Sequence, residues 1–99
     1  WRTAIVGSAS WSHAFLTPKN HWIYPDHATD RQRLAELKEN RIAAWRDLSR
    51  SELESAGEHE LTIWCALAGA MTDAGKRADV VDYVETWTLN TDSCFAVFA

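Results

Sequence analysis

Long apolar runs, excess positive charge and a cysteine framework are all missing from this sequence. No apolar run approaches the roughly 18 residues that a membrane-spanning helix needs, and we find no secretory signal pattern. Ten Lys and Arg against 14 Asp and Glu give a net charge of −4, which argues against a nucleic-acid-binding face because phosphates require clustered positive charge. Cys65 and Cys94 lie in apolar segments, so we expect two buried thiols in a reducing cytoplasm.

The chain has an ordinary globular composition with an unusual number of tryptophans. It is 46% hydrophobic and 24% charged over 99 residues, which predicts at most one ordered domain. Six Trp side chains are hard to bury in one small core, so we expect some of them to cover a partner surface. Because the first residue is Trp1 and not Met, we expect an upstream part of the same chain to be the simplest such partner.

The first half of the chain predicts a strand, a long loop and a helix. Residues 2–7 are small or β-branched and predict a short buried strand. Residues 8–22 have no clear period, and an aromatic loop of this length is typical of a site lining. Residues 28–45 predict an amphipathic helix capped by Asp26 or Thr29. Its apolar face carries Leu34, Leu37, Ile42 and Trp45, and its charged face carries Arg31, Arg33, Glu36, Lys38 and Arg41.

The second half predicts two helices followed by a hairpin. Ser51 and Glu54 have the spacing of a capping box and predict a short helix. Residues 57–74 predict a second long helix, because their apolar positions recur at helical spacing. Residues 80–89 and 94–98 predict two strands joined by a turn. The whole order predicts an α/β fold whose sheet is completed by residues outside this sequence.

Glu60 is the first candidate for chemistry. It precedes Trp64, Leu67 and Met71 at helical spacing, which places its carboxylate on the apolar face of the second helix. A buried, unpaired carboxylate costs several kcal/mol, so Glu60 would need a cation, a hydrogen-bond cluster or a metal. Alternatively, Glu60 lies close enough to the helix start to satisfy free backbone N–H groups. Spacing leaves both interpretations open.

His13 is the second candidate. It follows a Ser-rich stretch directly after the predicted strand, and ligand sites gather at the ends of strands in α/β sheets. A histidine in such a place can accept and return a proton near neutral pH. The alternative is a histidine that only forms hydrogen bonds with the backbone of its own loop.

Other motifs do not reach the pattern that their chemistry requires. The spacing of His13, His21 and His27 matches no common zinc motif. We expect His27 and His59 to lie at the surface, whereas His21 shares the aromatic loop. A serine nucleophile elbow is excluded, because Ala9 stands where the serine is required. The sequence also lacks a phosphate loop and a dinucleotide fingerprint.

Three stretches together resemble the class III extradiol ring-cleavage dioxygenases. Residues 7–17, Gly-Ser-Ala-Ser-Trp-Ser-His-Ala-Phe-Leu-Thr, resemble the stretch around the catalytic histidine of that family. Residues 60–71 are similar to its glutamate-bearing helix, and residues 82–98 resemble its closing hairpin. The nearest members are of the protocatechuate 4,5-dioxygenase and gallate dioxygenase type. The resemblance implies that residues 1–99 form the C-terminal part of such a catalytic domain.

The resemblance implies a non-haem Fe(II) site with two histidine ligands and one glutamate. Glu60 matches the glutamate ligand, which favours the metal interpretation over helix capping. His13 matches the acid–base histidine beside the iron. The two histidine ligands have no match in this sequence, and none of the remaining histidines replaces them. The chain alone is therefore expected to be inactive.

The activity that the resemblance implies is opening of a catechol-type ring next to its diol, with O₂ as the oxidant. The substrate is expected to be a protocatechuate- or gallate-like acid. His13 assists removal of a catechol proton and later donates one, and Trp11, Phe15, His21 and Trp22 are expected to line the pocket. A homo-oligomer or a complex with a small subunit is expected. The competing hypothesis is a non-catalytic binding module or subunit with the same fold, whose tryptophans serve a protein interface.

Overall fold

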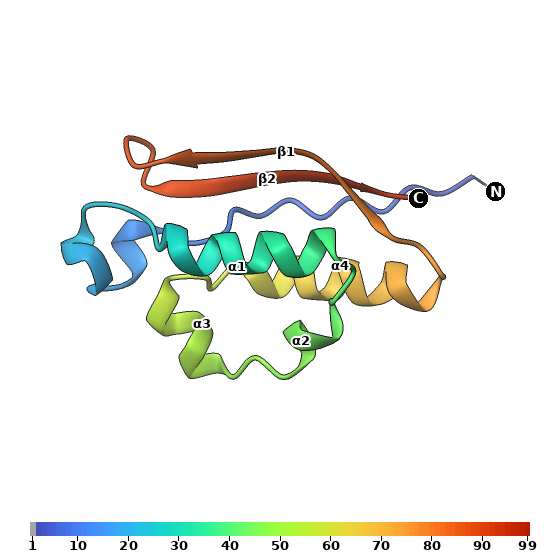
Figure 1. Ribbon diagram of the computed structural model, residues 1–99, viewed down its shortest axis with the longest axis horizontal. Coiled ribbons are helices and arrows are strands. Elements are labelled where there is room, and N and C mark those ends of the chain that lie inside the picture. Colours follow the sequence, from blue (N-terminus) through green and yellow to red (C-terminus); the bar gives the residue numbers. More distant parts are fainter. Residues whose placement is uncertain (1) are drawn as a thin grey trace.

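The computed structural model describes residues 2–99 and has a mixed α/β architecture, as the sequence predicts. Four α-helices precede an antiparallel two-stranded sheet, and two short 3₁₀ turns lie in the first loop (Figure 1). The elements in chain order are η1 (Ala14–Leu16), η2 (Lys19–Trp22), α1 (His27–Lys38), α2 (Ala43–Arg46), α3 (Arg50–Ala56), α4 (Leu61–Asp73), β1 (Ala78–Thr86) and β2 (Thr91–Phe98).

The elements form layers along the long axis of the molecule. The hairpin lies on one side of the long helices α1 and α4, and the short helices α2 and α3 lie on the other side (Figure 1). Strands β1 and β2 pair from Ala78 opposite Phe98 to Thr86 opposite Thr91, with an irregularity between Val80 and Asp82. The predicted hairpin is therefore confirmed.

Helix α1 begins where the sequence predicts and ends earlier. The Asp26 side chain accepts a hydrogen bond from the Thr29 N–H at 3.2 Å, so Asp26 is the cap. We expected one helix to continue to Trp45, but α1 ends at Lys38 and a separate turn, α2, carries Trp45. The break occurs at Asn40, whose φ of 56° lies in the left-handed region.

The short helix α3 is capped one half-turn earlier than predicted. The Ser49 side chain accepts from the Glu52 N–H, and the Glu52 carboxylate accepts from the Ser49 N–H at 2.7 Å. The capping box is thus Ser49–Glu52, and the predicted pair Ser51–Glu54 lies inside the helix. The helix ends at Gly57, whose φ is 71°.

The N-terminal segment is extended but is not a strand. Residues 2–7 join no hydrogen-bonded ladder among the described residues, and Ile5 and Val6 are exposed. The prediction of a buried strand here is wrong, because no described backbone pairs with this segment. Hydrogen bonds to the hairpin begin only farther along, where the Trp11 N–H donates to Asp92 O in β2 at 3.1 Å and the Ala14 N–H donates to Asn90 O in the turn at 2.9 Å.

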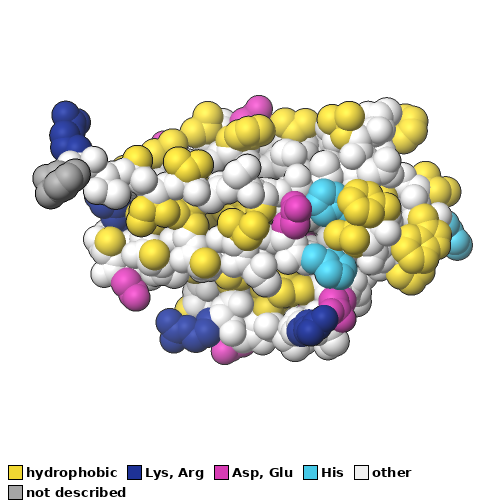
Figure 2. All heavy atoms as spheres, turned by 180° about the vertical axis from the view of Figure 1, so that it is seen from behind, with side chains coloured by type: hydrophobic (Ala, Val, Ile, Leu, Met, Phe, Trp, Pro, Cys, Tyr) yellow, Lys and Arg dark blue, Asp and Glu magenta, His cyan; other side chains and the backbone are white. Residues whose placement is uncertain are grey.

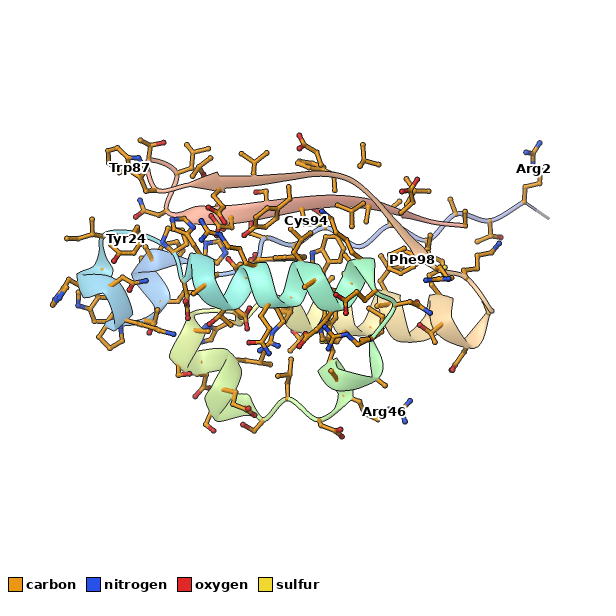
Figure 3. The ribbon with its side chains drawn as sticks, in the orientation of Figure 1. Arg2, Tyr24, Arg46, Trp87, Cys94 and Phe98 are labelled. Atoms are coloured by element: carbon orange, nitrogen blue, oxygen red, sulfur yellow. The ribbon has the colours of Figure 1, made fainter. Side chains whose placement is uncertain are left out.

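The core lies between the hairpin and the long helices, and three tryptophans are part of it. Trp11, Trp45 and Trp64 are buried, whereas Trp22 and Trp87 are 56% and 64% exposed. These two exposed side chains are available to a partner surface, and the expectation that some tryptophans cover such a surface stays a prediction. In Figure 3, Trp87 lies at the same end of the molecule as Tyr24, opposite Arg2 and Phe98.

Both thiols are free. Cys94 is buried, and Cys65 is half-buried rather than fully buried as expected. Burial raises the pKa of the Cys94 thiol to about 12.

Helix α4, of 13 residues, is the longest of the described helices, and none of them has the length and apolar character needed to cross a bilayer.

Candidate functional site

The structure brings together His13 and Glu60, which lie 47 residues apart in the sequence. His13 Nε2 lies 3.1 Å from Glu60 Oε2. Because a carboxylate only accepts, the proton of this hydrogen bond is assigned to Nε2. The His13 side chain is 12% exposed and the Glu60 side chain 47% exposed, so the pair lies at the surface with its imidazole mostly covered. The two residues can therefore act as one unit that is open to a ligand.

Glu60 does not cap its helix. It directly precedes α4, and its side chain makes no capping hydrogen bond to the helix N–H groups. Instead, Oε2 accepts from the Ser10 N–H at 3.0 Å and faces His13. The hydrogen bond with His13, supported by the bond from Ser10, lowers the pKa of the Glu60 carboxyl group. The capping alternative is wrong, and so is the expected burial, because nearly half of the Glu60 side chain is exposed.

His13 is held by backbone contacts from two directions. It forms a bridge with Thr91 at the start of β2, and its N–H donates to Gly57 O at 3.0 Å. The Phe15 ring lies 4.9 Å from the imidazole, measured between ring centroids. Among the described residues no hydrogen-bond partner reaches the buried Nδ1. His13 therefore does more than bond to its own loop, since its one side-chain hydrogen bond goes to Glu60.

The surroundings of the pair are open and partly apolar. On the face shown in Figure 2, an acidic side chain lies against a histidine, with apolar side chains to either side. Glu60 lines an open hollow of about 390 Å³. Its other lining residues are Ser8, Ala9, Ser10, Ser93, Cys94 and Phe95.

The pair fits part of a metal centre. Both hydrogen bonds to the Glu60 carboxylate reach Oε2, and none from residues 2–99 reaches Oε1. The lowered pKa keeps this carboxylate charged, as a metal ligand must be. A site with one carboxylate and two histidines needs two histidine ligands besides Glu60, and the described residues place Glu60 in no group of metal-ligating side chains that includes two histidines. The chain therefore fits one ligand position and an adjacent proton-transfer position.

The four residues that were expected to line the pocket lie in different places. Trp11 is completely buried in the core and cannot line a pocket. Phe15 lies against His13 with 60% of its surface exposed, whereas His21 and Trp22 are exposed on the η2 turn. Trp11 instead packs edge-on against Trp64, with ring centroids 5.7 Å apart. The aromatic residues of this loop thus divide between core and surface.

A buried carboxyl cluster contacts the His13 loop at Ser12, and the sequence did not indicate it. Asp30 is fully buried, and its carboxyl group accepts from the Ser12 N–H and from Ser12 Oγ, the latter at 2.5 Å. Burial, together with the nearby carboxyl groups of Asp92 and Glu58, raises the pKa of Asp30 to about 9, against the opposing effect of the Ser12 hydrogen bonds. Asp30 thus anchors the residue next to His13 while staying neutral.

Arg33 and Glu36 form a second part of this buried network, although their helix positions predicted solvent. Arg33 Nη1 lies 3.1 Å from Glu36 Oε2, and Arg33 Nε lies 3.4 Å from Glu58 Oε2. The Trp45 indole N–H also donates to Glu36 Oε2 at 2.7 Å. The opposite charges three residues apart on one helix were the available signal, but helical spacing alone does not tell a buried pair from an exposed one.

His27 also departs from expectation. It was expected at the surface, but its Nδ1 lies 2.7 Å from Oδ2 of the buried Asp92, and its side chain is 23% exposed. Its ligand atoms lie within 4.8 Å of those of Asp92 and Glu85, a spacing that a metal ion can bridge. Arg31 already pairs with both oxygens of Glu85, at 2.6 and 2.7 Å. The guanidinium therefore supplies the positive charge of this cluster.

Comparison with known proteins adds nothing to this geometry: no family model, no curated protein and no solved structure matches the chain.

Proposed function

We propose that this chain is part of an Fe(II)-dependent extradiol dioxygenase that opens a catechol-type ring next to its diol. The observation that carries the proposal is the 3.1 Å contact between His13 Nε2 and Glu60 Oε2. These are the two residues to which the resemblance gives functional roles, and the resemblance by itself does not require them to be in contact in this fold.

Glu60 is the proposed iron ligand in this mechanism. Its carboxylate would hold the iron, and Oε1, which accepts no hydrogen bond from residues 2–99, would be available for this, while Oε2 keeps its hydrogen bonds from Ser10 and His13. Two histidines supplied by a further segment of the protein complete the proposed ligand set. When bound, Fe(II) supplies open coordination positions and the redox chemistry that joins O₂ to the diol.

His13 moves the protons of the reaction. With Nε2 protonated toward Glu60, its other nitrogen is the basic one. That nitrogen, Nδ1, is buried, so we propose that the imidazole rotates and exposes it before it takes a proton from a catechol hydroxyl and returns the proton to the ring-opened product. The Phe15 ring against the imidazole excludes water from one side of it. The proposed substrate is a protocatechuate- or gallate-like acid.

The remaining proposals concern the setting of the enzyme. The two free thiols favour a reducing, cytoplasmic location. Exposed side chains such as Trp22, Trp87 and Leu89 favour contact with another subunit, either a second copy or a small partner. The same exposed side chains also favour the second candidate function, a non-catalytic binding module.

Oxygen uptake by the full-length protein tests the proposal. The protein is loaded with Fe(II) without air, and a catechol acid is added while O₂ and the yellow ring-opened product are followed. We expect Glu60→Gln to lose bound iron and His13→Gln to keep iron but lose roughly 10²–10⁴-fold in kcat. The matched control is His59→Gln, an exposed histidine beside Glu60. Iron retention by Glu60→Gln, or unchanged turnover in His13→Gln, contradicts the assignment and favours the binding module.

A further inference from the structure

The turn that carries Glu60 also holds His13 by an unusually close backbone contact. Gly57 ends α3 and begins the short connection to Glu60 and α4. Its carbonyl oxygen accepts from the His13 N–H at 3.0 Å. A Cβ placed on Gly57 would lie 2.6 Å from the carbonyl oxygen of His13 and 3.1 Å from Thr17 Cγ2. The first of these distances is shorter than side chains tolerate, so only glycine permits this approach.

A second link fixes the same two segments. Thr17 Oγ1 donates to Ser55 O at 2.7 Å, which ties the end of the His13 loop to the end of α3. The turn from Gly57 to Glu60 therefore connects the backbone of His13 to the carboxylate that its imidazole contacts, alongside the hydrogen bond from the Ser10 N–H to the same carboxylate. The Nε2–Oε2 distance of 3.1 Å is near the long end for an N–H···O hydrogen bond. A shift of a few tenths of an ångström is enough to break it.

We propose that Gly57 is a positioning residue for the His13–Glu60 pair. Because it has no Cβ, its backbone lies against that of His13, and this contact sets the distance between imidazole and carboxylate. The catalytic consequence rests on the proposed dioxygenase function, but the positioning itself does not. Any Cβ at residue 57 must separate the two backbones and so separate the pair.

A matched control comes from Gly75. It has nearly the same φ, 72° against 71° at Gly57, but nothing lies within 4 Å of a Cβ placed there. Gly75→Ala therefore carries the strain of positive φ without the contact. Gly57→Asn separates the strain of positive φ from the Cβ contact at residue 57 itself, because Asn tolerates positive φ better than Ala and still carries a Cβ.

The first readout is the ¹⁵N spectrum of the His13 side chain in full-length, metal-free protein labelled at histidine, with the signal assigned from His13→Gln. The spectrum of Glu60→Gln defines the His13 signal without the contact. We expect Gly57→Ala and Gly57→Asn to move the His13 signal to its position in Glu60→Gln. Adding Glu60→Gln to either Gly57 variant should then cause no further change in the signal. Gly75→Ala should leave the signal unchanged. If Gly57→Ala does not fold, Gly57→Asn carries the test.

The second readout is turnover of the iron-loaded protein. We expect Gly57→Asn to lower kcat by roughly 10²-fold with little change in KM, because misplaced catalytic groups slow chemistry more than they weaken binding. A wild-type His13 signal in either Gly57 variant overturns the positioning role. A shifted signal in Gly57→Asn with no oxygen uptake even in the wild type supports the positioning role and rejects the dioxygenase function.

Discussion

At the scale of single residues, Asp30 shows how burial changes the chemistry of a carboxyl group. It is fully buried beside Glu58 and Asp92 and accepts hydrogen bonds from Ser12. Burial raises its pKa from 3.8 to about 9 in the folded chain. Between these values the folded state keeps a proton that the unfolded chain releases. The stability that Asp30 contributes is therefore complete below about pH 4 and is lost as the pH rises toward 9.

The prediction is that Asp30→Asn removes this pH dependence, because an amide stays neutral at every pH in the range. Through Asp30, the free energy of unfolding of the wild type should fall by at most about 1.4 kcal/mol per pH unit between about pH 5 and pH 8, and that of Asp30→Asn should fall less. Urea unfolding at several pH values measures this. Asp47→Asn, at an exposed site, is the control and should parallel the wild type. Parallel curves for Asp30→Asn would mean that Asp30 is charged when folded.

At the scale of elements, helix α3 shows where a sequence motif is ambiguous. The segment contains two Ser-x-x-Glu patterns, Ser49 to Glu52 and Ser51 to Glu54. The first makes the capping box in the structure, whereas Glu54 pairs with Arg50 at 2.5 Å. The residue types alone do not decide which of the two pairs forms the capping box, because that depends on the residue at which the chain leaves α2. The existence of a helix was predictable here, and its first residue was not.

The two serines give an element-scale prediction. Ser49→Ala should destabilise the protein by about 1 kcal/mol, since it removes the acceptor for the first N–H groups of α3. Ser51→Ala should change stability little, because Ala is a better helix former than Ser inside a helix. Thermal or chemical unfolding of the two variants checks the order. Equal losses would mean that the helix starts at either residue.

The same limit applies to the site. The sequence identified His13 and Glu60 as separate candidates, His13 for proton transfer and Glu60 for metal binding, and these roles stay predictions. Their contact was not derivable from spacing, because it depends on Gly57 and on the pairing of the His13 loop with β2. Asp30 and Asp92 were missed for a related reason. Carboxylates on an amphipathic helix or in a hairpin are usually solvated, so their burial has no local signal.

At the scale of the whole molecule, the hairpin and helix α4 were predictable, because α4 buries the apolar residues that recur at helical spacing. Helix α1 was predictable in its start but not in its end or its buried face, which is mostly charged. The extended N-terminal segment was not predictable, because strand propensity is realised only where a neighbouring strand accepts the hydrogen bonds. Within residues 2–99, the outer side of the hairpin also lacks a neighbouring element, and its side chains Val81, Phe95 and Val97 are exposed. The sequence predicted strands at these positions, and among the described residues nothing covers the three side chains.

The tryptophans are likewise divided between buried and exposed positions, and this difference gives a prediction about the stability of the whole molecule. Trp11 joins the first loop to α2 and α4 through edge-on contacts with Trp45, at 6.5 Å between centroids, and with Trp64, at 5.7 Å. Trp11→Ala should therefore destabilise the fold by roughly 3–5 kcal/mol, since it leaves a large cavity at the junction. A domain of this size has about 5–15 kcal/mol in total, so the variant should be close to unfolding. Trp87→Ala, at an exposed turn, should change stability by no more than about 0.5 kcal/mol. Urea unfolding followed by far-UV circular dichroism compares the two, and similar losses would show that the core does not depend on Trp11.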